Sequence, residues 1–185
     1  MDKYADFAQD NIFVFRPSKM NKMREVAEMN KGRPRYRICA HQDTSDNLQE
    51  MYICAKDEGY IPVYKHPDTA TTHFILEGII ALVIFDEAGS ISRVEILDKE
   101  KGAWSCRVGA GIYYMTFVVT TWATYFECKA GPFTAASNVL APWTPDAKDG
   151  QAVDEFMKRV EDAVNGSCRA IGLGTIEDSR KGRCS

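Results

Sequence analysis

A succession of short β-rich runs, divided by turn residues, fills the chain from Tyr36 to Lys129. The connections are short and rich in turn formers, as in 57–59 (DEG) and 86–89 (DEAG). Loops of this length join antiparallel strands, because parallel strands need long crossovers. The pattern therefore predicts an antiparallel sandwich or barrel. The expected strands lie near Tyr36–His41, Gln49–Ala55, Tyr60–His66, Thr71–Glu77, Ile79–Phe85, Ile91–Leu97, Ala103–Val108, Ile112–Val119 and Trp122–Lys129.

Helical spacing of apolar residues predicts one helix on each side of this region. Ser18 is the expected cap of the first helix and Gly32 its end. The second helix carries an apolar stripe and ends at Asn165-Gly166; the stripe consists of Val153, Phe156, Met157, Val160 and Val164. We therefore expect an N-terminal strand and helix in residues 1–34, a barrel in 35–145, a C-terminal helix in 146–166 and a flexible tail in 167–185.

Composition limits the class of protein. The chain has 185 residues, of which 45% are hydrophobic and 26% charged, a globular composition. The net charge of −3 leaves no excess of Lys and Arg to neutralise nucleic-acid phosphates. The N-terminus is polar and acidic, unlike a secretory signal, and the longest apolar run, Ile79–Phe85, is much shorter than a membrane-spanning helix. We expect a cytoplasmic protein with neither nucleic acid nor membrane as a partner.

Six cysteines are present, an even number that would permit disulfides. The sequence contains no CxxC pair, and the cytoplasm keeps thiols reduced. Segments such as Ile38-Cys39-Ala40 are typical of strand interiors, where Cys behaves as a small hydrophobic residue. We predict reduced, structural thiols at Cys39, Cys54, Cys106, Cys128, Cys168 and Cys184.

Six segments together resemble the WbuC-type cupin fold metalloproteins. In order they read RYRICAHQDTSDNLQEMYICA, YIPVYKHPDTATTHFILEG, IFDEAGSI, GAGIYYMTF, YFECKAGPF and APWTP, and they run from Arg35 to Pro145. The resemblance implies an all-β dominated fold, a single small jelly-roll-like cupin barrel that is antiparallel and has short N-terminal and C-terminal helices. It also implies a cytoplasmic protein that can pair into a homodimer.

The metal motif of the family is largely substituted in this chain. Metal-binding cupins carry two His separated by one residue, then a Glu, and a further His in a second motif. The resemblance places these positions on Tyr64, His66, Thr71 and Tyr114, so that one of the four expected ligands remains.

Strand alternation extends this cluster, because inward positions recur at every second residue. If Tyr64 and His66 point into the barrel, Thr71 does so too, and His73 follows on the same face. The resemblance places Tyr114 next to these residues. A cavity lined by two of the three histidines of the chain is thus expected.

One interpretation of the cluster is a displaced metal site. His66 and His73 would supply nitrogen ligands to a single divalent transition metal, with tyrosine or water completing the shell. Binding through tyrosine costs free energy near neutral pH, since the phenol must first lose its proton.

A second interpretation is acid–base chemistry without a metal or other cofactor. His66 would accept a proton next to a carbonyl, and Tyr114 or Tyr64 would return one, as in an epimerase or isomerase.

A third interpretation is a non-catalytic module, in which the tyrosines are core residues with one hydrogen-bond partner each. Such a protein would bind a small molecule or act as a structural unit.

The favoured hypothesis is a degenerate cupin that binds a small polar molecule, sugar-like or anionic, in its barrel. His73 and Thr71 would help to bind the ligand, and Arg37 and Glu50 would form a pocket rim that holds an anion. The alternative for Arg37 and Glu50 is a surface ion pair worth about 0–1 kcal/mol.

Overall fold

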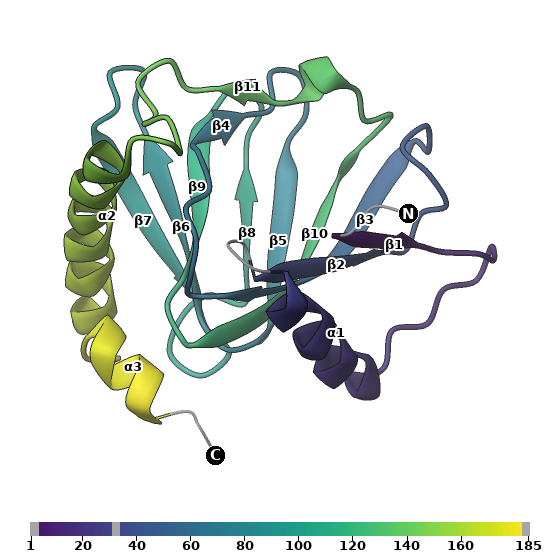
Figure 1. The fold of residues 1–185 in the computed structure, drawn as a ribbon, viewed down its shortest axis with the longest axis horizontal. Helices are drawn as coiled ribbons and strands as arrows, with labels where there is room; N and C mark the ends of the chain where they lie inside the picture. The colour runs from purple at the N-terminus through teal and green to yellow at the C-terminus, as the bar shows by residue number, and fades with distance from the viewer. Residues whose placement is uncertain (1–3, 31–33, 183–185) are drawn as a thin grey trace.

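The strands that the structure describes pair into two β-sheets that face each other (Figure 1). The computed structural model describes residues 4–30 and 34–182. One sheet has the order β1 (Ala5–Phe7), β2 (Arg35–Cys39), β3 (Leu48–Lys56), β10 (Trp122–Ala130), β5 (Thr71–Glu77) and β8 (Ser105–Val108). The other has the order β11 (Val139–Leu140), β4 (Tyr64–Lys65), β9 (Tyr113–Val118), β6 (Ile80–Phe85) and β7 (Ile91–Leu97).

The order of these strands is that of a jelly roll. Strands β3, β10, β5 and β8 lie side by side in one sheet, and β4, β9, β6 and β7 lie side by side in the other. Apart from the hairpin of β6 and β7, each successive strand from β3 to β10 crosses to the opposite sheet. Cupins share this double-sheet architecture. The predicted fold class is confirmed, and the eight strands that define it coincide with strands expected from the sequence.

Strand β6 does not alternate between apolar and polar residues, because both of its faces are buried. Ile80 and Leu82 face the first sheet, whereas Ala81 and Val83 belong to a second core on the outer side. Helix α2 (Gly150–Ala170) covers that outer side, as Figure 1 shows. A strand buried on both faces is apolar at every position.

Helix α1 (Pro17–Met29) packs on the outer face of β2 and β3 and buries Met23 and Ala27. It begins at Pro17, one residue before the expected cap Ser18. Proline suits the first helical position because its missing N–H would have no partner there. The expected stop, Gly32, lies outside the described residues.

The strand expected over Tyr60–His66 is shorter in the structure. Only Tyr64–Lys65 forms β4, whose partners are β9 and β11. Before β4, the hydroxyl of Thr144 accepts a hydrogen bond from the Val63 N–H at 2.9 Å and bonds the Tyr60 hydroxyl at 2.6 Å. These side-chain contacts replace strand pairing and hold the segment against the loop before α2.

The C-terminal region is more ordered than the sequence predicts. The apolar stripe of α2 continues past Asn165 to Cys168, which is fully buried, and the helix ends at Ala170. A short helix, α3 (Ile176–Gly182), follows, and the Asn165 side chain accepts a hydrogen bond from the Ile176 N–H at 2.8 Å. Ile176 packs into the same core as α2. The expectation of a flexible tail from residue 167 is therefore corrected as far as residue 182.

Cysteines in the described residues carry free thiols, namely Cys39, Cys54, Cys106, Cys128 and Cys168. The sixth, Cys184, lies outside the described residues. No helix in the described part of the chain is long and apolar enough to cross a membrane.

Candidate functional site

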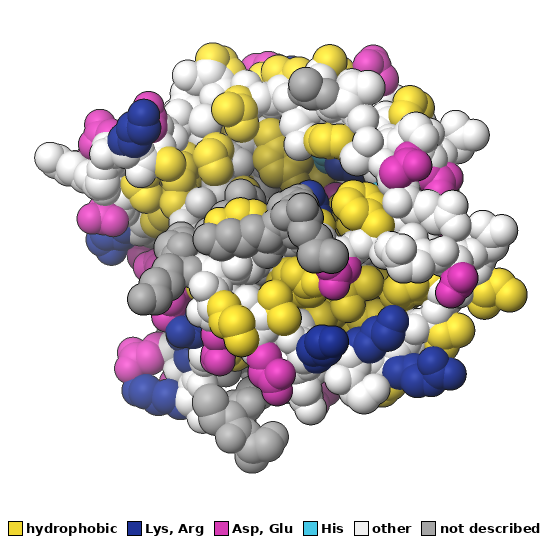
Figure 2. Space-filling view, turned by 45° about the vertical axis from the view of Figure 1, so that its right-hand side comes forward, with side chains coloured by type: hydrophobic (Ala, Val, Ile, Leu, Met, Phe, Trp, Pro, Cys, Tyr) yellow, Lys and Arg dark blue, Asp and Glu magenta, His cyan; other side chains and the backbone are white. Residues whose placement is uncertain are grey.

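A cavity of about 290 Å³ lies between the sheets, against β2, β3 and β10. Its lining includes His41, Thr44, Phe133, Ile61 and Tyr64. Figure 2 shows a hollow on this face in which Lys or Arg side chains and a histidine are visible at depth. The other part of the space between the sheets is filled by a hydrophobic cluster that includes leucine, isoleucine and tyrosine side chains.

The structure brings the expected cluster together between the sheets. Tyr64 and Tyr114 are paired across β4 and β9, with their ring centroids 5.3 Å apart. The His66 ring lies 5.4 Å from that of Tyr64, and the His73 ring 5.6 Å from that of Tyr114. Thr71 is 1% exposed. Of these five side chains, Tyr64 lines the cavity, and the other four are buried between the sheets.

Strand β10 contributes two charged side chains that the sequence analysis did not place in the site. Tyr125, Glu127 and Lys129 recur at every second residue and point between the sheets, where Glu127 is 4% and Lys129 is 8% exposed. Charged groups are seldom buried unless they are paired. Their burial on the inward face of the central strand therefore marks them as functional candidates.

These residues form a chain of polar contacts with the two histidines. His66 Nδ1 donates to the Ser137 carbonyl at 2.7 Å, and His66 Nε2 lies 3.3 Å from the Lys129 ammonium. The Lys129 Nζ lies 3.8 Å from Glu127 Oε1, and Glu127 Oε2 lies 3.5 Å from His73 Nε2. Because a carbonyl oxygen only accepts, the Ser137 contact fixes the His66 proton on Nδ1 and leaves the Nε2 lone pair facing Lys129.

Burial and neighbouring charges set the protonation of this chain. Burial lowers the pKa of Lys129, an effect that Glu127 partly opposes. Burial also lowers the pKa of His66, and the Lys129 charge lowers it further. Burial alone would raise the pKa of Glu127, but the hydrogen bond and charge of His73 and the Lys129 charge hold that pKa far below its usual range. Glu127 is therefore a carboxylate at neutral pH.

The two tyrosines stay protonated for the same reason. Burial raises the pKa of Tyr64, and the Glu127 charge raises it further. Burial and the adjacent Tyr64 raise the pKa of Tyr114 well above its usual value. A phenol that keeps its proton donates hydrogen bonds but is a poor metal ligand.

The residues present do not fit a metal. His66 Nε2, the one nitrogen in a family metal position, already faces the Lys129 ammonium at 3.3 Å, and Glu127 is shared between Lys129 and His73. In the described part of the chain, no group of three or more His, Cys, Asp or Glu side chains is arranged to hold an ion. At the displaced site predicted at His66 and His73, a lysine cation lies where a dication would approach the His66 ring.

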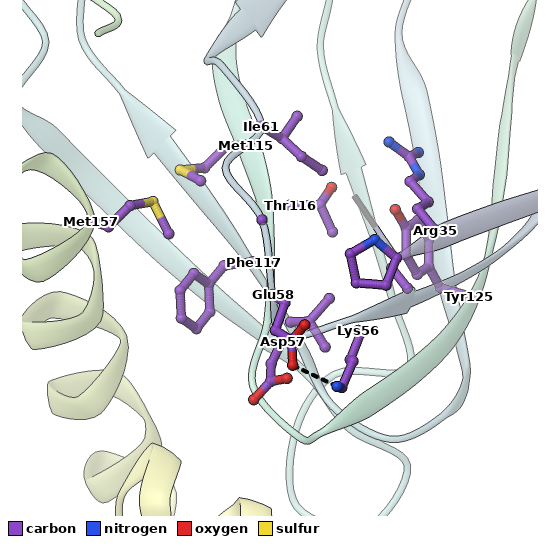
Figure 3. Close-up of a pocket in the computed structure, with 14 residues that line it drawn as sticks. Arg35, Lys56, Asp57, Glu58, Ile61, Met115, Thr116, Phe117, Tyr125 and Met157 are labelled. Carbon is purple, nitrogen blue, oxygen red and sulfur yellow. Dashed lines mark hydrogen bonds and ion pairs between the residues drawn. The ribbon is translucent and has the colours of Figure 1, made fainter. Parts of the chain in front are cut away.

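Two arginines on β2 add positive charge to the cavity. Arg35 and Arg37 are two residues apart, so they project to the same side of the strand, and both line the cavity. Figure 3 shows the guanidinium of Arg35 beside Tyr125, pointing up from β2 and away from Asp57 and Glu58.

The expected rim of Arg37 and Glu50 does not form. Arg37 lies opposite Ile53 in the ladder, and Ile53 is three residues from Glu50 along β3. Side chains an odd number of residues apart lie on opposite faces, so Glu50 points to the outside of the sheet, next to Cys128. Gln49 takes the inward place and lines the cavity.

The signal for Arg35, Glu127 and Lys129 was present in the sequence. Ala123, Tyr125, Glu127 and Lys129 alternate with residues of the other face, and Arg35 precedes Arg37 by two residues. What the sequence lacks is the order of the strands, which places β10 between β3 and β5.

Comparison with known proteins gives a family match without an assigned activity. Residues 15–97 match a family described as a domain of unknown function, DUF6016. No curated protein matches the chain.

Solved structures with a similar fold share little sequence with this chain. An uncharacterized Klebsiella pneumoniae protein with a double-stranded β-helix domain is 14% identical, with a TM-score of 0.48 over 72% of this chain and 93% of its own. Protein SO0799 from Shewanella oneidensis is 13% identical, with a TM-score of 0.44 over 55% of this chain and 66% of its own. CapF, solved with the inhibitor 3-isopropenyl-tropolone, is 9% identical, with a TM-score of 0.47 over 57% of this chain and 30% of its own.

Other matches are covered only in part. The chain spans 55% of peruvianin-I, 21% of procruciferin and 47% of oxalate oxidase.

Proposed function

We propose that this jelly roll binds a small anionic molecule in the cavity between its sheets. The observation that carries the proposal is the charge of the cavity wall. Arg35, Arg37 and Lys129 converge on one enclosed space, and among the described residues that line it Glu127 is the sole carboxylate. Arginine binds carboxylate and phosphate oxygens through two parallel hydrogen bonds, which are strong when water is excluded.

The size of the cavity limits the ligand. Drug-sized ligands occupy pockets of roughly 300–1,000 Å³, and about 290 Å³ lies at the lower end of that range. A metabolite-sized carboxylate or phosphate fits this space, whereas a nucleic acid or a polypeptide does not.

Ligand-dependent thermal stability tests this function. A ligand at 100 times its Kd raises stability by about 2.7 kcal/mol, which increases the melting temperature. We expect small carboxylates or phosphate to raise it, and Arg37→Gln to weaken the effect at least about tenfold in concentration, since a hydrogen bond to a charged group contributes about 1.5–3 kcal/mol.

The matched control is Arg93→Gln, which removes the same charge from an exposed side chain on β7. It should bind like the wild type. The anion site would be overturned if Arg37→Gln and Arg93→Gln weakened the ligand-dependent rise in melting temperature equally. Stabilisation by neutral sugars alone would also overturn it.

A second candidate function is proton transfer without a metal, and one contact favours it. Tyr64 lines the cavity, and the centroid of its ring lies 5.4 Å from that of the buried His66, so a hydroxyl donor at the cavity wall has an imidazole close to it. Tyr114 lies behind Tyr64 and supports it. Exchange of solvent deuterium into a bound carbonyl compound, abolished in His66→Ala and in Tyr64→Phe, is the expected result; binding without exchange would leave a non-catalytic module.

We also propose that the chain is a WbuC-type cupin whose metal positions have been replaced. Support comes from the six matching segments and from the interior placement of Tyr64, His66, Thr71 and Tyr114. Restoring the family residues by Tyr64→His, Thr71→Glu and Tyr114→His, together with Lys129→Met, should create a stoichiometric zinc or nickel site. A folded variant without metal affinity would count against this origin.

A further inference from the structure

Lys129 has the surroundings of an activated nucleophile. Its amine lines the cavity, its side chain is 8% exposed, and its Nζ lies 3.3 Å from the unprotonated nitrogen of His66. His66 is oriented by the Ser137 carbonyl at 2.7 Å. A nucleophile, a base within reach and a third group that orients the base form the arrangement used in covalent catalysis.

Burial, helped by the charges of Arg37 and Arg35, lowers the pKa of Lys129, and Glu127 only partly opposes this effect. Glu127 Oε1 lies 3.8 Å away, and the same carboxylate faces His73 through its other oxygen. Arg35 and Arg37 act on the amine with like charge. Lysines that are buried next to other cations are the ones that enzymes use to form Schiff bases.

We propose that Lys129 forms an imine with a small oxo acid. The carboxylate of the ligand would be held by Arg35 and Arg37, while its carbonyl carbon meets the Lys129 amine. The proposal rests on the anion site described above and names the substrate class of that site, a carbonyl compound that carries a carboxylate.

Lys129, His66 and the ligand supply all the protons and electrons that imine formation needs. Lys129 passes one ammonium proton to His66 Nε2, and its lone pair attacks the carbonyl carbon while the C=O π electrons move to oxygen. His66 returns the proton to that oxygen, which gives a carbinolamine. The nitrogen then loses a proton to His66, and the hydroxyl leaves as water with that proton. The sum is one ammonium and one ketone giving one protonated imine and one water, with no oxidant or reductant.

Reductive trapping tests the proposal. The protein is incubated with pyruvate, levulinate or acetone and with cyanoborohydride, which reduces an imine to a stable secondary amine, and the adduct is located by mass spectrometry of peptides. We expect one adduct, on Lys129, with pyruvate or levulinate. Acetone, which lacks a carboxylate, should label at least about tenfold more slowly, since a charged hydrogen bond contributes about 1.5–3 kcal/mol.

Two variants separate chemistry from folding. Lys129→Arg keeps the charge and should abolish the adduct, and its melting temperature without ligand shows whether the variant is folded. His66→Gln should slow labelling at least about tenfold, because general bases contribute about 100- to 10,000-fold. Lys65, a partly exposed lysine paired with Glu87 outside the cavity, serves as the internal reference for unspecific labelling.

The outcomes distinguish this inference from the proposed function. Carboxylate binding that depends on Arg37, together with labelling of Lys129 no faster than of Lys65, overturns the imine and leaves the anion site. An absence of both binding and labelling overturns the two together. Labelling of Lys129 that is unchanged in Arg37→Gln and with acetone overturns the oxo-acid class.

Discussion

The Lys129 ammonium lies 3.3 Å from Nε2 of His66, the one histidine that the resemblance places in a metal position of the cupins. A covalently attached cation thus occupies the side of the ring to which a metal would bind. The amine also faces Glu127 and opens to the cavity, so the chain itself supplies a basic group at this wall. The proposed anion site rests on three basic side chains, Lys129 and the two arginines of β2.

Removing the carboxylate at the centre of this network should destabilise the fold. Glu127→Gln leaves Lys129 and Arg35 without their buried negative partner and the His73 ring without its ion contact. Breaking a buried charge pair by deleting one partner costs about 3–5 kcal/mol. Urea unfolding at neutral pH measures the change, and Glu87→Gln, on the surface, is the control. A loss below about 1 kcal/mol, the range of surface pairs, would contradict the account.

The same carboxylate predicts a dependence of stability on pH. In the folded protein the pKa of Glu127 is lower than its ordinary value of 4.5, so the unfolded chain binds a proton more readily as the pH falls. Its contribution is therefore complete above pH 4.5 and declines as the pH falls further. The difference in unfolding free energy between wild type and Glu127→Gln should shrink as the pH falls below about 5, and should go on shrinking as the pH falls further. If the difference in unfolding free energy grew as the pH fell, the pKa of Glu127 would be raised in the folded protein, contrary to this account.

Two glycines should respond to alanine with opposite sign. Gly78 has a φ of +72°, and a Cβ there would lie 2.7 Å from Thr120 Oγ1 and closer still to the Trp122 carbonyl. We expect Gly78→Ala to destabilise the protein by at least about 1–3 kcal/mol. Thermal unfolding measures this loss; an unchanged melting temperature would mean that the turn between β5 and β6 is not constrained as described.

Gly166 lies inside α2 with no atom near its would-be Cβ. Alanine is favoured over glycine in a helix interior by about 1 kcal/mol. Gly166→Ala should therefore raise the melting temperature. Destabilisation would instead place the end of the helix at Asn165-Gly166, where the sequence suggests it.

Helix α2 should be an integral part of the domain. Phe156 is 4% exposed, and its ring lies 5.8 Å from that of Phe85 and 6.0 Å from that of Tyr60. Phe156→Ala is expected to cost about 3–5 kcal/mol, as large-to-small changes in cores do. Lys158→Ala, at an exposed position of the same helix, should change stability by less than about 1 kcal/mol. Similar small effects of both changes would show that α2 is dispensable.

Local patterns were sufficient to predict the strands and the inward face of the site. The alternation of Thr71 and His73, and the turn residues between runs, depend only on neighbours in the sequence. The jelly roll followed from antiparallel connections and the resemblance, and the strand order bears it out.

Features that depend on distant partners could not be predicted in this way. Lys129 meets His66, 63 residues earlier, because β10 lies beside β5 in one sheet while β4 faces them from the other. Glu50 was placed with Arg37 because the register between β2 and β3 was unknown. The seven-residue α3 is too short to show a hydrophobic period, and Asn165 and the core hold it in place. Thr175 and Asp178 cap its first turn, a local signal that the sequence analysis did not use.

Crystallography with a labelled small anion tests the central claim most directly. Dimethylarsinate carries an arsenic atom whose anomalous scattering locates it without ambiguity. The account predicts an anomalous peak inside the cavity, with the anion's oxygens within hydrogen-bond distance of Arg37 and Arg35. Arsenic found only on surface lysines, with the interior cavity free of the anion at saturating concentration, would contradict it.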